Sequence, residues 1–165
     1  MAPNPKPTLV ATLMINKILA AALISGVGTF LLVAGFIVGK PMARAGSSPL
    51  ELLSIGLLVL MLIVPPVAAR LVSAQAMKQI PPGDFAAQDP VDLGRRLLQV
   101  YQVQMLVQLA PLEGASLFGA VVFLVMQSPV GLAVALAGMV AMAMRFPTRS
   151  RVESWLAAAV QKARG

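Results

Sequence analysis

Four apolar segments constrain the fold of this chain more than any other feature. They cover residues 18–38, 50–69, 105–126 and 130–144. A membrane-spanning helix needs about 20 mostly apolar residues, because the hydrocarbon core of a bilayer is about 30 Å thick. Only 12% of the residues are charged, whereas soluble domains carry about 25%. The sequence therefore predicts an all-α, polytopic membrane protein, with four transmembrane helices as two hairpins and the lipid bilayer as a partner.

Proline and glycine clusters divide the chain into five parts. We expect a disordered tail over residues 1–12 and a first helical hairpin over residues 13–80. A cytoplasmic loop over residues 81–89 separates this hairpin from a second one over residues 90–146. Residues 147–165 follow as an amphipathic helix that lies in the membrane interface.

Local signals indicate where the helices start and bend. Ser48-Pro49 and Asp89-Pro90 each combine a helix-capping residue with a proline suited to the first turn. No strong stop signal interrupts residues 90–127, so we expect one long helix that projects beyond the membrane. Pro65-Pro66 predicts a kink near the end of the second span, because proline lacks the N–H group that closes a helical turn.

The C-terminal segment has the pattern of an amphipathic helix. Ser150 and Glu153 match a capping box, and the apolar residues that follow recur at the spacing of one helix face. Trp155 lies on this face, and Arg149 and Arg151 lie near its start. Because basic and aromatic residues in this pattern are typical of helices at a membrane surface, we interpret Trp155, Arg149 and Arg151 as membrane-interface residues.

Basic residues predict the orientation in the membrane. Eleven of the 13 Lys and Arg residues lie in the N-terminal segment, in or beside the long loop, or in the C-terminal segment. The connection between the first two spans holds the other two, Lys40 and Arg44. Lys and Arg are enriched in cytoplasmic loops, so we expect both termini and the long loop to be cytoplasmic. The eleven are Lys6, Lys17, Arg70, Lys78, Arg95, Arg96, Arg145, Arg149, Arg151, Lys162 and Arg164.

A signal-peptidase site is the alternative interpretation of the first span. Ala43-Arg44-Ala45 resembles such a site. The apolar core of a signal peptide covers about 7–15 residues, however, and residues 18–38 form a longer segment. We therefore favour a transmembrane helix that is retained.

An internal duplication is suggested by a shift of 88 residues, which aligns the first span with the third. Ala22, Gly26, Phe30, Val33 and Pro41 then meet identical residues. Two hairpins related in this way would have a pseudo-two-fold axis along the membrane normal, as in parallel-repeat transporters. The alignment makes Ser25 the counterpart of Glu113.

Glu113 is the candidate site residue, because it is the acid that lies deepest within a predicted span. Ionisable residues inside a membrane are costly and often functional. Ser25, Ser116 and Gln108 complete the predicted intramembrane polar site. Two roles remain open: a neutral Glu113 hydrogen-bonded between helices near Ser25, or a carboxyl group that handles protons or cations.

Small residues indicate where helices approach one another. Gly35 and Gly39 form a GxxxG pattern, and Gly26, Gly114 and Gly119 lie in the first and third spans. Because glycine lets helix backbones come close in a membrane, we predict that these five residues pack helices. Packing within the bundle is the favoured interpretation of the GxxxG pattern, and a dimer interface is the alternative.

The chain lacks the residues that several kinds of chemistry require. The chain has neither Cys nor His, which removes disulfides, thiolate and histidine metal ligands, and the histidine general base. No nucleophile–base pair or metal-ligand pattern is evident, so we expect no enzyme activity, no cofactor and no metal. The net charge is +7, and the basic residues that produce it flank the apolar spans. This position favours binding to anionic lipid over nucleic acid.

The stretch from Leu112 to Val122, with Glu113 followed by small residues, an aliphatic–aromatic pair and Gly119, resembles the carboxylate helix of rotary-ATPase proteolipid subunits. That resemblance implies an ion-binding role for Glu113. It departs from the family because Glu113 lies on the first helix of its hairpin and the glycine ladder is reduced to Gly26 and Gly28.

A second resemblance concerns the fold. The Leu-Glu-Gly-Ala segment, followed by Phe146-Pro147-Thr148-Arg149 and a Val-Glu-x-Trp helix, is similar to small four-helix membrane proteins of bacteria. It implies a multi-pass protein of the bacterial inner membrane. We expect a non-enzymatic accessory or scaffold protein whose partners are other membrane subunits or a second copy. The alternative is proton or cation translocation centred on Glu113.

Overall fold

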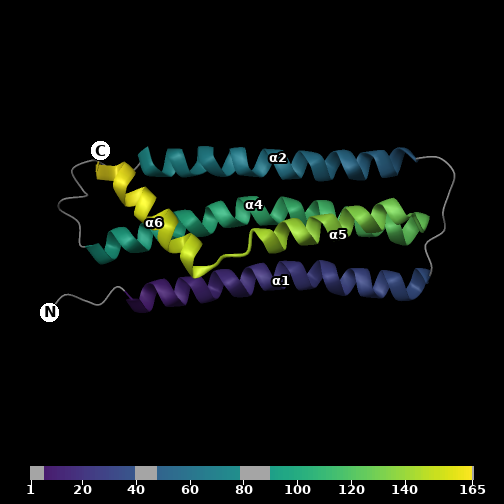
Figure 1. The fold of residues 1–165 in the computed structure, drawn as a ribbon, viewed down its shortest axis with the longest axis horizontal. Helices are drawn as coiled ribbons and strands as arrows, with labels where there is room; N and C mark the ends of the chain where they lie inside the picture. The colour runs from purple at the N-terminus through teal and green to yellow at the C-terminus, as the bar shows by residue number, and fades with distance from the viewer. Residues whose placement is uncertain (1–5, 40–47, 79–89, 165) are drawn as a thin grey trace.

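The computed structural model describes residues 6–39, 48–78 and 90–164, and within them all regular structure is helical (Figure 1). The helices are α1 (Lys6–Val38), α2 (Pro49–Lys78), α4 (Pro90–Met126), α5 (Pro129–Met144) and α6 (Arg149–Arg164).

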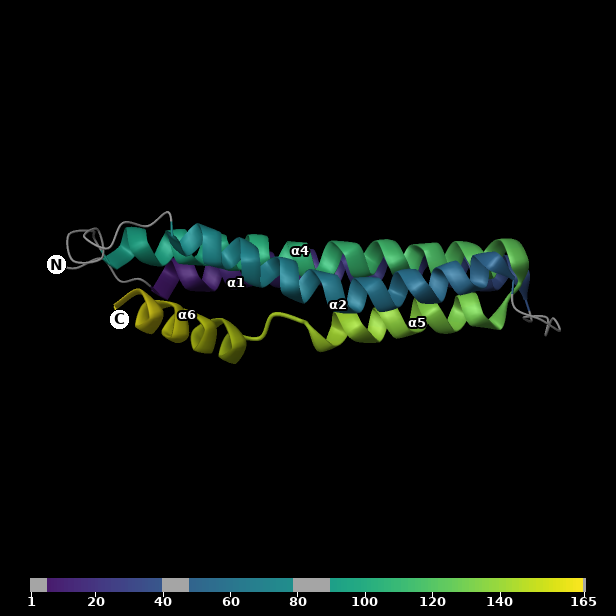
Figure 2. The same ribbon diagram turned by 90° about the horizontal axis from the view of Figure 1, so that it is seen from above.

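Helices α1, α2, α4 and α5 form an elongated bundle and alternate in direction along the chain (Figures 1 and 2). Helix α4 is central, since it packs against α5, α2 and α1. Helices α1 and α2 lie on opposite sides of α4 and α5 (Figure 1). The second half of the chain thus forms a packed hairpin, whereas the first two helices, which we expected to pair directly, are separated by the second hairpin.

This asymmetry bears on the expected duplication. A two-fold axis that exchanged the two halves would place α1 against α2 as closely as α4 lies against α5. The pair α4–α5 has the most extensive contact in the bundle, and α1–α2 has little. Helices α1 and α4 do run in the same direction and pack on each other, as the alignment of the first and third spans predicts.

Three helical segments are long and apolar enough to cross a bilayer: Val10–Val38, Pro49–Val72 and Gly94–Met126. Helix α5 has 16 residues, and with α6 it forms a fourth candidate that bends by 62°. The described chain therefore contains three to four candidate membrane spans, in agreement with the predicted membrane protein.

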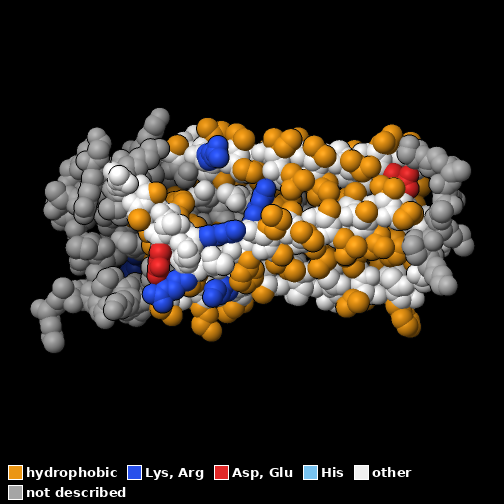
Figure 3. Space-filling model, in the orientation of Figure 1, with side chains coloured by type: hydrophobic (Ala, Val, Ile, Leu, Met, Phe, Trp, Pro, Cys, Tyr) orange, Lys and Arg blue, Asp and Glu red, His pale blue; other side chains and the backbone are white. Residues whose placement is uncertain are grey.

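The outer surface of the bundle is apolar where a bilayer would surround it. Leu32, Phe36 and Val125 are 77%, 92% and 70% exposed. Soluble proteins rarely expose apolar surface on this scale. On the face drawn in Figure 3, the Lys and Arg side chains gather in the half of the molecule that carries both termini, and hydrophobic side chains cover the other half.

Close packing of α4 on α5 depends on glycine. A Cβ atom on Gly131 would lie 2.5 Å from the backbone nitrogen of Phe123, and one on Gly119 would lie 3.0 Å from the backbone nitrogen of Ala135. The contact at Gly131 would require the backbone to move, and the contact at Gly119 would be tighter than nearly all those that real side chains make. The prediction that Gly119 packs helices thus agrees with its position.

Helix α4 agrees with the sequence-based expectation, because it is continuous from Pro90 to Met126 and contains Pro111. Helix α1 differs, because it begins at Lys6 and includes residues 6–12, which we expected in a tail. Helix α2 continues through Pro65-Pro66 as far as Lys78, and the predicted kink there stays a prediction.

Helix α6 packs its apolar face against the bundle. Val152 is buried together with Leu13 of α1 and Leu98 of α4, and Tyr101 and Leu156 pack on this cluster. Val152 and Ala159 of the predicted interface stripe are therefore buried, whereas Trp155 and Leu156 are half-buried. The expected capping box is absent: α6 begins at Arg149, so Ser150 lies within the helix.

Candidate functional site

Glu113 lies on the side of α4 that faces α1. A Cβ atom on Gly26 would be 3.8 Å from Oε1 of Glu113, so the carboxyl group sits against a position of α1 that lacks a side chain. Glu113 itself is partly buried. The predicted approach of the third span to the first span near Gly26 thus has a direct counterpart in the structure.

The other members of the predicted polar site are dispersed. Ser25 is exposed and its hydroxyl donates to the carbonyl of Ala22, 3.1 Å away. Ser116 is buried and donates to the carbonyl of Leu112 at 2.7 Å. Gln108 lines a different hollow, toward the α5–α6 connection. The hydroxyls of Ser25 and Ser116 therefore bind carbonyls of their own helices, and they do not extend a chain of polar groups from Glu113.

A shallow hollow of about 510 Å³ lies on the face of α1 next to Gly26. Four of its lining residues are small, and they recur at the spacing of one helix face. They leave room for the backbone of another helix. The lining residues are Ala22, Ser25, Gly26, Thr29, Phe30 and Val33.

The GxxxG pattern has another explanation. Gly39 has a φ of 69°, a conformation that suits glycine at a helix end. Its N–H group donates to the carbonyl of Gly35 at 2.9 Å, which closes the last turn of α1. No atom lies within 4 Å of a Cβ built on Gly35, Gly39 or Gly114. These three glycines, which we predicted to pack helices, make no close helix contact in the described chain.

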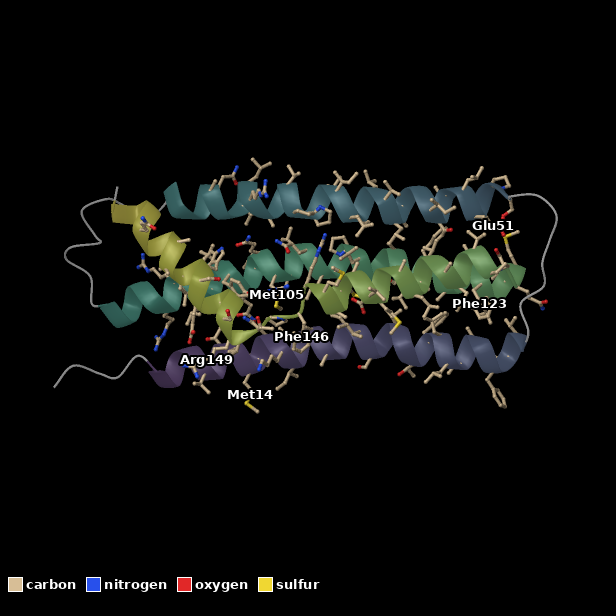
Figure 4. All side chains as sticks on the ribbon, viewed as in Figure 1. Met14, Glu51, Met105, Phe123, Phe146 and Arg149 are labelled. Atoms are coloured by element: carbon tan, nitrogen blue, oxygen red, sulfur yellow. The ribbon has the colours of Figure 1, made fainter. Side chains whose placement is uncertain are left out.

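A polar cluster that we did not predict lies at the opposite end of the bundle from the termini. Glu51, in the first turn of α2, is only 7% exposed. Its carboxylate accepts hydrogen bonds from the backbone N–H of Ser48, at 2.8 Å, and from the hydroxyl of Ser128. Ser48 in turn caps the N–H of Glu51 at 3.2 Å. Ser128 connects α4 to α5, so Glu51 joins the start of α2 to this turn (Figure 4).

Part of this polar cluster is predictable from the sequence. Ser48 and Glu51 have the spacing of a capping box, in which each residue satisfies the backbone N–H of the other. An acid in the first turn also interacts favourably with the helix dipole. The hydroxyl of Ser128 additionally caps α5 through the N–H of Val130 at 3.2 Å. The geometry indicates a structural role for Glu51.

Arg145 forms a second unpredicted connection. It follows α5 as its C-cap. Its guanidinium group donates to the carbonyl of Leu62 on α2 at 3.2 Å and to the carbonyl of Gln108 on α4 at 3.5 Å. Arg145 therefore links the end of α5 to both neighbouring helices.

The predicted interface residues surround the start of α6. Arg151 donates to the carbonyl of Met144 at 2.6 Å, and the ring of Trp155 packs edge-on against Tyr101 at 5.4 Å between centroids. Arg149 is exposed and pairs with Glu153 at 2.7 Å. This hydrogen bond raises the pKa of the Arg149 guanidinium.

Asn16 is a further buried polar residue, with 1% exposure on α1 between Leu13 and Ala20. Within the described part of the chain, neither side-chain polar atom of Asn16 has a hydrogen-bond partner. The residues that the structure describes contain no cluster of three or more His, Cys, Asp or Glu residues that could hold a metal ion.

Comparison of the chain with protein-family models, curated proteins and solved structures finds no match.

Proposed function

We propose that this chain is a non-enzymatic, multi-pass protein of the bacterial inner membrane, and that it acts as a scaffold or accessory subunit by associating with a second copy of itself. In this proposal α1, α2, α4 and α5 all cross the bilayer. Both termini and α6 lie on the cytoplasmic side.

The orientation is supported by the distribution of charge. On the face drawn in Figure 3, the Lys and Arg side chains gather in the half of the bundle that carries the termini, and Arg149 and Arg151 belong to the first turn of α6. The short α5 is compatible with a fourth span, because its 16 residues extend about 24 Å at about 1.5 Å per residue. The guanidinium group of Arg145, directly after α5, is bound by the carbonyls of Leu62 and Gln108 on the neighbouring helices.

One observation carries the proposed self-association: the hollow beside Gly26 lies next to the carboxyl group of Glu113. Ala22 and Gly26 are four residues apart, and so are Ser25 and Thr29. Spacings of this kind let two transmembrane helices approach closely. The same face on a second copy would complete a symmetric contact and would cover the carboxyl group, which is costly to leave against lipid.

Cross-linking of single cysteines tests this interface, and the natural chain has no cysteine to interfere. Ser25→Cys places a thiol in the hollow. Leu60→Cys is the matched control, because it is exposed on α2 and lies at a similar distance, about 20 Å, from the loop end of the bundle. Oxidation in native membranes should give a disulfide-linked dimer with Ser25→Cys and little with Leu60→Cys.

Two results would contradict the proposal. Equal dimer yields from both variants would indicate random collision. A cross-link from Ser25→Cys to a protein of another mass would replace the second copy by a different membrane subunit.

Proton or cation translocation centred on Glu113 remains the second candidate. The observation in its favour is that this intramembrane acid lies beside an open hollow instead of inside the core. The hydroxyls of Ser25 and Ser116 argue against it, because both donate to their own helices. Transport paths in membranes usually contain a chain of polar groups.

A further inference from the structure

A second hollow, of about 370 Å³, lies where α5 ends and α6 crosses α4. We call it the elbow pocket. Figure 4 shows the surrounding region, in which Phe146 and Arg149 lie at the α5–α6 connection. Its volume is within the range of about 300–1,000 Å³ that is usual for ligand pockets. The lining residues are Tyr101, Gln108, Arg145, Arg151, Ser154 and Trp155.

All six lining side chains carry a hydrogen-bond donor, and none of them is acidic. Hydroxyl, amide, indole and guanidinium groups therefore converge on one space. Within the described chain, the ion pair that the structure shows is Arg149–Glu153, which lies outside this set. The charges of Arg145 and Arg151 have no carboxylate in the pocket to balance them.

Both guanidinium groups are held in place. Arg145 donates to the carbonyls of Leu62 and Gln108, and Arg151 donates to the carbonyl of Met144. Each guanidinium has further N–H groups beyond those used. Arginines that are fixed by main-chain carbonyls can bind an anion without first losing much conformational freedom.

The position of the pocket suggests the source of the anion. Helix α5 extends about 24 Å from its start to Arg145, which is close to the thickness of the hydrocarbon core, about 30 Å. The pocket therefore lies near the level of the lipid headgroups on the side of the termini. Met144 beside it is 69% exposed and offers an apolar surface for an acyl chain.

We infer that the elbow pocket binds an anionic phosphate group, and that this group is the headgroup phosphate of an anionic phospholipid in the leaflet on the side of the termini. The two arginines supply charge-assisted hydrogen bonds, which are stronger than neutral ones. Tyr101 and Trp155 supply neutral donors, whereas the hydroxyl of Ser154 already donates to the carbonyl of Arg151 at 3.0 Å. This inference rests on the membrane location of the chain but is independent of self-association through α1.

The pocket contains its own probe, because Trp155 is the single tryptophan of the chain. The full-length protein is titrated in mixed micelles with phosphatidylglycerol, and Trp155 fluorescence is recorded. Phosphatidylcholine and inorganic phosphate form the comparison arms. We expect a saturable change with phosphatidylglycerol and none with the other two.

Matched variants separate a defined pocket from general surface charge. Arg151→Gln should raise the half-saturating lipid fraction about tenfold, which corresponds to the loss of about 1.4 kcal/mol. Arg149→Gln removes the same charge from the same helix outside the pocket and should have little effect. Tyr101→Phe removes one hydroxyl and should give a smaller increase, so it provides a second measurement if Arg151→Gln does not fold.

Three outcomes would overturn the inference. The first is a linear, unsaturable response to phosphatidylglycerol. The second is an equal effect of Arg149→Gln and Arg151→Gln, which would indicate non-specific attraction. The third is saturation by inorganic phosphate alone at similar concentrations, which would assign the pocket to a soluble anion. Failure of the Ser25→Cys cross-link would leave all three measurements unaffected.

Discussion

The guanidinium group of Arg145 donates a hydrogen bond to the carbonyl oxygen of Leu62 at 3.2 Å. In a regular helix the N–H group of residue 66 would bind this carbonyl, but Pro66 has no N–H. The proline thus leaves an acceptor without its usual partner in α2, and an arginine at the end of α5 supplies the missing donor. The bond thus replaces one of the two N–H donors that Pro65-Pro66 remove from α2, which continues through them as one helix.

We predict that Arg145→Met destabilises the bundle by about 1–3 kcal/mol, because in a bilayer the carbonyl of Leu62 would have no water to replace the lost donor. In a Pro66→Ala background the same substitution should cost less, because an alanine at this position restores the N–H group that binds the carbonyl of Leu62. The coupling energy between the two positions follows from the unfolding free energies, in mixed micelles, of the unsubstituted protein, the two single variants and the double variant. Additive effects would show that Arg145 does not compensate for the proline.

The side chains of Glu51 and Ser128 should also be coupled. Ser128→Ala removes the donor to Glu51 and the cap of α5, and loss of a helix cap typically costs about 1 kcal/mol. Glu51→Ala removes the acceptor for both serines. We expect the double variant to be more stable than the sum of the single effects predicts, as measured by the same unfolding assay. Strict additivity would exclude an energetic link between the start of α2 and the α4–α5 turn.

These two connections show what the sequence can and cannot specify. The capping box of Ser48 and Glu51 is local, so its spacing alone predicts it. The partner Ser128 is 77 residues away from Glu51. In the same way, Pro66 predicts a free carbonyl but not that Arg145, 83 residues from Leu62, will bind it. Such pairs depend on how the helices pack, which one sequence does not encode in a readable pattern.

The helices themselves were more predictable than their arrangement. The continuous α4 follows from a proline start and from the absence of strong breakers, because local signals determine where a helix begins and ends. The predicted direct pairing of the first two spans was wrong, because α4 occupies the space between them. Helix α4 packs closely on α5 through Gly119 and Gly131. The apolar stripe of α6 was visible, but a stripe does not distinguish lipid from protein as its covering.

Gly138 should tolerate no larger residue. A Cβ atom there would overlap the hydroxyl of Ser116, which is buried and bonded to its own helix. We predict that Gly138→Ala destabilises the bundle by about 1–3 kcal/mol, the usual range for overpacking. Gly35→Ala is the control, because no atom lies within 4 Å of its Cβ position. Ser116→Gly should restore much of the stability of Gly138→Ala, and an absence of rescue would argue against this contact.

Glu113 distinguishes the two candidate functions through its accessibility. If the second copy covers the hollow beside Gly26, a hydrophobic carbodiimide should modify Glu113 poorly in native membranes and readily once detergent has separated the copies. An ion-binding carboxyl group that faces lipid should react in the membrane as well. Glu113→Gln is the control for the site of modification, because the amide cannot react in this way.

Substitutions of Glu113 then test its part in the contact. Gln retains a hydrogen-bond donor and an acceptor, so Glu113→Gln should preserve the Ser25→Cys dimer. Glu113→Leu should weaken association by about 1 kcal/mol, the scale of hydrogen bonds between membrane helices, and should lower the dimer yield. Rapid carbodiimide labelling in membranes, together with a dimer yield that Glu113→Leu leaves unchanged, would separate the carboxyl group from the interface. That result would favour the ion site, because an exposed acid would then have no structural reason to lie on this face of α4.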